Sequence, residues 1–282
     1  MSAGDTYSRE AWRRETSKHA IGFHVTMPLA DERGIARAPA ELRIGARVLL
    51  RQGKDRGLVA FRIADTHVHA LVVGSRVEAG KLALYAETCL RRHLRIPIPF
   101  ERCRVRPIDN ERHLLHALRY IFRQEAHHGT AFDEAHDGSS LPDLLGLRLG
   151  AAWIASRVRR LLPRLKRGTL MEWLGVPALH DVEPDLRLLA DAAAAAWGVP
   201  TLHGGSVAHV RARRAAVQLL DRLVPGASAL DLRGLHPRSI ARYRSQPVNA
   251  ADLNAVEQQL KLRALLRARV AAGVDWPAQL PG

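Results

Sequence analysis

Two short strand-like stretches, 57–64 and 66–73, are separated by a single residue, Asp65. Their period-two alternation is typical of β-strands, and so short a connection indicates an antiparallel hairpin. The hairpin therefore predicts an antiparallel sheet in the N-terminal half of the chain.

The segments around this hairpin give the order of the other elements. Further strands are predicted at 20–27 and 102–108, and helices at 39–52, 77–94 and 109–126. The resulting order is β-α-β-β-α-β-α. Its first six elements are those of a split βαβ, ferredoxin-like sandwich, so we expect an α+β fold here.

A stretch rich in Gly, Ser, Asp and Pro, 137–146, has the composition of a linker. We expect it to divide an N-terminal domain, 1–136, from an all-α region, 147–282. Helices are predicted in the second region at 147–166, 185–197, 207–223, 227–234, 237–244 and 250–271.

The chain is strongly basic, with 43 Lys and Arg against 28 Asp and Glu, a net charge of +15. Such a surplus favours a polyanionic partner, most often nucleic acid, although a GC-rich genome also enriches arginine whatever the function. The excess is seven charges in 1–136, seven in 201–282 and only one between them. This distribution indicates two nucleic-acid surfaces.

Several classes of protein are not expected from this sequence. No apolar run reaches the ~20 residues of a membrane span, and the N-terminus lacks the apolar segment of a secretory signal. The two cysteines, Cys89 and Cys103, form no metal or disulfide framework. We therefore expect a cytoplasmic protein, associated with the nucleoid and not with a membrane.

His67 and His69 stand two residues apart on the predicted strand 66–73. Alternation points both side chains to one face of the sheet, while Val68 and Ala70 face the core. Two imidazoles on one face can bind a divalent metal, but such a site needs a third ligand from a neighbouring element. The alternative is two histidines that lie at the surface or are satisfied by hydrogen bonds within the protein.

A second feature lies on the predicted helix 109–126, where Tyr120 and Gln124 are one turn apart on the same face. If this helix packs beside the histidine strand, Gln124 can offer its carbonyl oxygen to the metal. Tyr120 is then a candidate nucleophile, because a nearby cation favours the phenolate. Arg119 and Arg123 flank the pair and can hold phosphates. The alternative for Tyr120 is ordinary packing at the edge of the core.

Three blocks of the chain together resemble the single-tyrosine HUH-type transposases, including the REP-associated tyrosine transposases. GFHVTM at 22–27 is similar to that family's opening strand, and DTHVHALVV at 65–73 to its paired-histidine strand. ALRYIFRQEA at 117–126 is similar to its tyrosine helix. The resemblance covers about residues 20–130, and the order and spacing of the blocks fit.

The resemblance implies an HUH nuclease domain in which His67 and His69 bind Mg²⁺ or Mn²⁺ and Gln124 is the third ligand. Tyr120 would attack a DNA phosphate and become linked to the 5′ end. In one departure, Gln124 and Glu125 stand where many REP-associated members have Asn-Pro.

The expected function is therefore that of a DNA transposase, a metal-dependent single-strand DNA endonuclease and strand transferase. Its expected substrate is single-stranded or hairpin DNA of palindromic repeats. ATP is not expected, because a phosphotyrosine conserves the energy of the broken bond. Some relatives act as dimers, so a homodimer is one expected state.

The segment 74–84 looks like a P-loop but fails its pattern. Five residues separate Gly74 from Gly80 where four are needed, and Leu82 replaces the Ser or Thr that would bind Mg²⁺. Lys81, near the start of a predicted helix, can still contact a DNA phosphate.

The C-terminal region contains a candidate helix-turn-helix within about 209–246. A short helix, a turn at Gly234 and a second helix, 237–244, have the spacing of that motif. The second helix would present Arg238, Arg242 and Arg244, with Ser239 and Tyr243 between them, to phosphates or guanine edges. The alternative is a basic helical hairpin without this role.

Two other functions compete with the transposase. One is a domesticated relative of these transposases that binds hairpin DNA or RNA without cleaving it. The other is a plain RNA-binding ferredoxin-like domain, which needs exposed aromatic residues on its sheet. Phe61 is the main candidate for such a residue.

Overall fold

The computed structural model describes residues 19–31, 33–124, 133, 135–173, 179–226, 232 and 235–272. The first seven of the described elements follow the predicted order. They are β1 (Gly22–Pro28), α2 (Pro39–Gly53), β2 (Leu58–Ile63), β3 (His67–Val72), α3 (Arg76–Leu94), β4 (Arg104–Ile108) and α4 (Glu111–Phe122).

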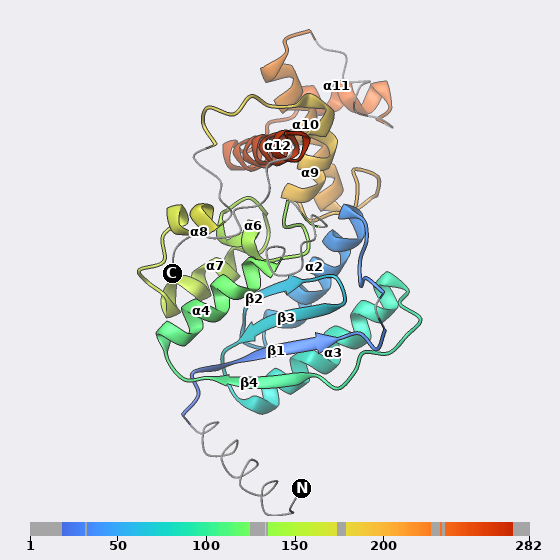
Figure 1. Ribbon diagram of the computed structural model, residues 1–282. Coiled ribbons are helices and arrows are strands. Elements are labelled where there is room, and N and C mark those ends of the chain that lie inside the picture. The colour runs from blue at the N-terminus through green and yellow to red at the C-terminus, as the bar shows by residue number, and fades with distance from the viewer. Residues whose placement is uncertain are drawn as a thin grey trace, which may run out of the picture.

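The four strands form one antiparallel sheet in the order β2-β3-β1-β4 (Figure 1). Strand β3 lies between β1 and β2, so the connection through α2 crosses one strand position. The β2–β3 hairpin is closed by the Ala64 N–H, which donates to the His67 carbonyl over 2.9 Å. The expected α+β fold with an antiparallel sheet is confirmed.

Helices α2 and α3 cover one face of the sheet. Gly45 of α2 lies against Ile63, and a Cβ there would stand 2.4 Å from the Ile63 Cδ1 atom, so the end of the Ile63 side chain fills the space that the glycine leaves. Ile63 pairs with Val68 of β3, which places this helical layer on the Val68 face. The two histidines of β3 therefore face the opposite side.

That opposite face is covered unevenly. Helices α4 and α7 (Ala152–Leu161) contact β2, and every residue of β2 is buried. Phe61 is completely buried, so it cannot be the exposed base-stacking residue that a plain RNA-binding domain would use. At the far edge, Arg104 and Arg106 of β4 are exposed.

Beyond residue 147, the described part of the chain contains helices and no strand. The helix predicted at 147–166 is shorter, and α8 falls outside the predicted helices. Most of the helix predicted at 227–234 lies outside the described residues. The remaining elements of the described residues are α6 (Leu141–Leu144), α8 (Arg167–Trp173), η1 (Leu186–Leu188), α9 (Leu189–Ala196), α10 (Val207–Leu223), α11 (Pro237–Ser245) and α12 (Ala250–Ala271).

The helices divide between two apolar cores. Leu141, Ile154 and Leu170, from α6, α7 and α8, pack with the core of the sheet. Helices α9 to α12 form a second core around residues such as Leu219 and Val256. In Figure 1 these four helices lie beyond the β2 side of the sheet, away from β4. No described helix has both the length and the apolar character needed to cross a bilayer.

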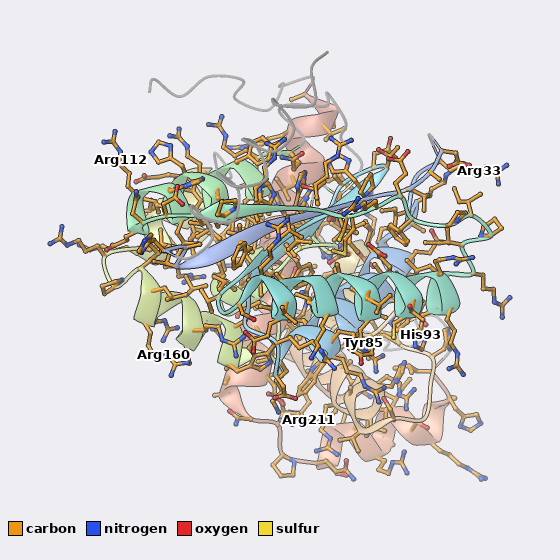
Figure 2. The ribbon with its side chains drawn as sticks, turned by 90° about the horizontal axis from the view of Figure 1, so that it is seen from below. Arg33, Tyr85, His93, Arg112, Arg160 and Arg211 are labelled. Atoms are coloured by element: carbon orange, nitrogen blue, oxygen red, sulfur yellow. The ribbon has the colours of Figure 1, made fainter. Side chains whose placement is uncertain are left out.

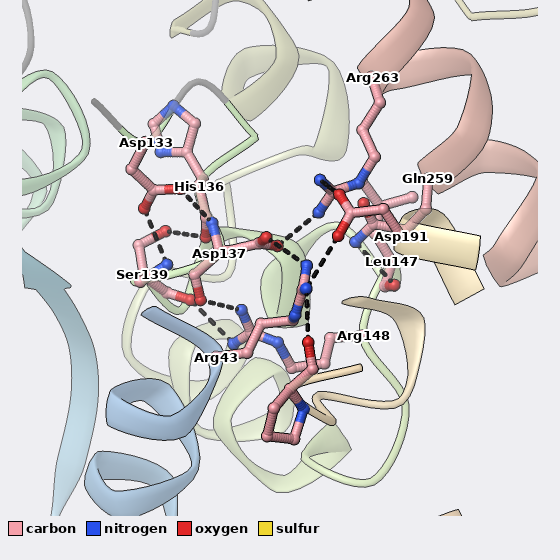
Figure 3. A network of polar contacts seen from close by, with 12 residues as sticks. Arg43, Asp133, His136, Asp137, Ser139, Leu147, Arg148, Asp191, Gln259 and Arg263 are labelled. Carbon is pink, nitrogen blue, oxygen red and sulfur yellow. Dashed lines mark hydrogen bonds and ion pairs between the residues drawn. The ribbon is translucent and has the colours of Figure 1, made fainter. Parts of the chain in front are cut away.

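A largely buried ring of charges, formed by Arg43, Asp137, Arg263 and Asp191, joins the two cores (Figure 3). Arg43 contacts one carboxylate oxygen of Asp137 and one of Asp191, each at 2.8 Å. Arg263 contacts the other Asp137 oxygen at 2.6 Å and also pairs with Asp191. The ring thus uses residues from α2, α9, α12 and the segment 137–146, which is mostly buried although its composition predicted a linker.

Candidate active site on the open sheet face

His67 and His69 lie on the same face of β3, and their Nε2 atoms are 2.8 Å apart. Their rings meet edge to face, with centroids 4.5 Å apart. The sequence places both side chains on one side because residues two apart in a strand share a face. The structure adds that the two nitrogens converge, which alternation alone does not require.

The other ring nitrogen of each histidine also has a polar neighbour. His69 Nδ1 lies 2.9 Å from His24 Nε2 and 3.4 Å from the Thr26 hydroxyl. His67 Nδ1 lies 3.4 Å from the Thr66 hydroxyl. Both Nδ1 positions can therefore carry the hydrogen and donate it, which leaves the two Nε2 lone pairs on the shared side.

Sequence reasoning missed His24, although it lies in the block 22–27. His24 and Thr26 alternate on β1 and face the same side as His69 because β1 pairs directly with β3. Burial, together with the charges of Arg106, His113 and His67, lowers the pKa of His24 to about 4. His24 is therefore neutral near pH 7 and can accept a hydrogen from His69.

Helix α4 brings Tyr120 to this cluster. The helix begins at Asn110, whose side chain accepts the His113 N–H at 2.9 Å. The Tyr120 ring centroid lies 5.5 Å from that of His69 and 6.0 Å from that of His24. Tyr120 is 41% exposed, so a large substrate can reach its ring from solvent.

Gln124 lies just past the regular end of α4, which stops at Phe122 and not at 126 as predicted; residues 125 and 126 lie outside the described part. The helix breaks at Arg123, whose φ and ψ of −110° and 26° are not helical. The Tyr120 carbonyl then accepts the Arg123 N–H at 3.2 Å and the Gln124 side-chain N–H at 3.1 Å. Gln124 is buried and tied to the segment that carries Tyr120.

The other predicted contacts of the N-terminal half lie in different places. Arg119 and Arg123, on either side of Tyr120, are both half-buried. Lys81 is exposed on α3, in the second turn and not at the helix start. Since α3 covers the other face of the sheet, the structure does not bring Lys81 to the histidines. Figure 2 shows this arrangement, with Tyr85 of α3 on one side of the sheet and Arg112 of α4 on the other.

The predicted C-terminal contacts lie on α11. Arg238 and Arg242 are exposed, whereas Arg244 makes a two-pronged ion pair with Asp221 of α10, at 2.8 and 2.9 Å. Tyr243 does not lie on the presented face as predicted: it is buried, and its hydroxyl accepts from Arg213 at 3.1 Å. The predicted turn at Gly234 falls outside the described residues, so the helix-turn-helix stays a prediction.

Comparison with protein-family models, with curated proteins and with solved structures found no match for this chain.

Proposed function

We propose that this protein is a metal-dependent single-strand DNA endonuclease and strand transferase, a transposase of the single-tyrosine HUH type. The observation that carries the proposal is the meeting of Tyr120 with the histidine pair, from two separate elements, with ring centroids 5.5 Å apart. The strand order β2-β3-β1-β4 supports a split βαβ, ferredoxin-like framework for the domain.

Tyr120 is the nucleophile in this proposal. Its hydroxyl oxygen attacks a DNA phosphate, a new bond forms between that oxygen and phosphorus, and the bond to the 3′ oxygen breaks. The 5′ end remains on Tyr120 and a free 3′ hydroxyl leaves. A second 3′ hydroxyl can reverse the exchange without ATP, because each step breaks one phosphoester bond and forms another.

The histidine pair suits a divalent cation such as Mg²⁺ or Mn²⁺. Both Nδ1 atoms have acceptors, so both Nε2 lone pairs can serve as ligands. Within the described residues no three His, Cys, Asp or Glu side chains are arranged to hold a metal ion together. The third protein ligand in this proposal is the Gln124 amide. When bound, the cation would polarise the phosphate and favour the Tyr120 phenolate.

His24 positions His69 by accepting its Nδ1 hydrogen. Replacing His24 with Ala should therefore weaken Mn²⁺ binding about 10- to 100-fold, the usual effect of losing a partner of a histidine ligand. His24→Gln, whose amide oxygen can accept the same hydrogen, should recover part of the affinity. Isothermal titration with Mn²⁺ measures the change directly and needs no DNA.

His93→Ala is the matched control for this variant. His93 is exposed on α3, on the far side of the sheet (Figure 2), so its loss should leave Mn²⁺ affinity unchanged. Equal affinities for the parent and His24→Ala would contradict the role of His24.

The C-terminal region holds or selects DNA in this proposal. Arg238 and Arg242 stand exposed on α11, which is separated from β4 by the width of the sheet (Figure 1). The preferred substrates are single-stranded DNA and hairpins formed by palindromic repeats, and a homodimer is compatible with this role.

A covalent-adduct experiment tests the proposed function. The parent protein, mixed with Mn²⁺ or Mg²⁺ and a hairpin-bearing single strand, should form a protein–DNA adduct that survives a denaturing gel. EDTA should abolish the adduct, and peptide mapping should place the DNA on Tyr120. A protein that binds the hairpin tightly but forms no adduct would instead be a nucleic-acid-binding protein without cleavage.

A further inference from the structure

The edge strand β4 carries a row of arginines that the sequence analysis did not single out. Arg104 and Arg106 are exposed on this strand, and Arg102 precedes them at the same two-residue spacing. We call these three residues the arginine row. Alternate residues of a strand lie about 6.7 Å apart on one face, so the guanidinium groups can contact successive phosphates of an extended chain.

The register of the sheet places this row on the face of the histidines. Arg104 pairs with Thr26 of β1, which in turn pairs with His69 of β3. Arg106 pairs with His24 in the next position along the sheet. Residues directly opposite each other share a face, so Arg104 is two strand spacings, about 10 Å, from His69.

The arginine row has no internal counter-charge within the described part of the chain. No ion pair or side-chain hydrogen bond joins Arg104 or Arg106 to a carboxylate there, whereas the nearby Asp109 pairs with His113 at 3.5 Å. The cations are thus available to an anion that approaches the histidines and Tyr120.

An edge strand can also bind a peptide that adds to the sheet as a further strand, but the edge of β4 is poorly suited to this. Pro107 has no N–H to offer. The Val105 carbonyl already accepts a hydrogen bond from Arg76 of α3 at 3.0 Å. Because these backbone groups cannot pair with another strand, the edge of β4 offers a ligand its cationic side chains and not a ladder of backbone hydrogen bonds.

We infer that the arginine row is a phosphate track, along which a single-stranded nucleic acid is led across β1 to Tyr120. This inference rests on the proposed function, because it gives the path by which the substrate enters that same site. The track lies at the edge of the sheet opposite α9 to α12, so it is distinct from the contacts predicted on α11 (Figure 1).

Binding of a fluorescent oligo-dT single strand in EDTA tests the track without any cutting. The double variant Arg104→Ala plus Arg106→Ala should bind about 25-fold more weakly at 0.1 M salt. Its slope of log affinity against log salt should fall by about 1.4, since each contact with a single strand contributes about 0.7.

Arg91→Ala plus Arg92→Ala is the matched control, because it removes the same charge from exposed positions on α3, beneath the other face. The control should keep the parent's affinity and slope. An unchanged slope in the Arg104 and Arg106 variant, or an equal loss in the control, would overturn the track. An equal loss for a duplex of the same length would overturn its assignment to single strands.

This experiment separates the track from the proposed function. A parent protein that forms the Tyr120 adduct, together with a double variant that binds oligo-dT normally, would refute the track alone. If the parent forms no adduct but the Arg104→Ala plus Arg106→Ala variant binds oligo-dT more weakly than the parent, the nuclease is refuted and the track is kept.

Discussion

Tyr120→Phe should abolish DNA cleavage and adduct formation, lowering the cleavage rate by at least about 10³-fold, because removal of a nucleophile takes away the reacting atom itself. The substitution removes one oxygen and keeps the ring that lies 5.5 Å from His69. The fold and the affinity for single-stranded DNA should therefore change little. Gel analysis of labelled DNA measures cleavage, and fluorescence anisotropy measures binding.

Tyr85→Phe is the matched control for this prediction. Tyr85 is 45% exposed, close to the 41% of Tyr120, but it lies on α3 with the Arg56 guanidinium 4.4 Å from its ring centroid. No described histidine pair stands beside it. Normal cleavage by Tyr120→Phe, or an adduct on Tyr85, would show that Tyr120 is not the nucleophile.

Asp137→Asn should lower the free energy of unfolding by about 3–5 kcal/mol, the typical cost of removing one partner from a buried ion pair. The Asp137 side chain is 1% exposed and holds Arg43 and Arg263 together. Without its charge, both guanidinium groups would depend on Asp191, whose side chain is 37% exposed. Urea unfolding followed by tryptophan fluorescence measures the loss.

Asp221→Asn provides the same chemical change in an exposed pair. Asp221 bonds Arg244 with both carboxylate oxygens, and both side chains are open to solvent. Exposed pairs contribute little because water screens them, so this variant should unfold close to the parent. If both variants lowered the free energy of unfolding equally, burial would not make the ring of charges more important for stability than an exposed ion pair.

The N-terminal elements could be predicted because each has a strong local signal. Alternation marks the strands, and helix starts such as Asn110 carry a capping side chain. His67 and His69 share a face by spacing alone, and the position of Tyr120 follows once α4 packs on the sheet. Local pattern therefore specified the order of these elements and most residues of the candidate site.

The missing parts depend on contacts between distant residues. His24 meets His69, and Arg104 joins the same face, only because β1 lies between β3 and β4. Asp137 lies in a segment with the composition of a loop. Its partners Arg43 and Arg263 are far away in the sequence, so nothing near Asp137 predicts that it is buried between them. The end of α4 at Arg123 could not be predicted from the sequence either, because the apolar pattern of the helix runs without a stop signal up to Phe122.

The ring of charges also has a consequence for the order of events during synthesis. Arg43 leaves the ribosome about 220 residues before Arg263, a delay of roughly 10–45 s at ordinary rates of translation. Until α12 emerges, Asp137 can pair with Arg43 but the ring stays open. Its closure waits for α12, so a product that ends before α12 would lack the junction that fastens the two cores together.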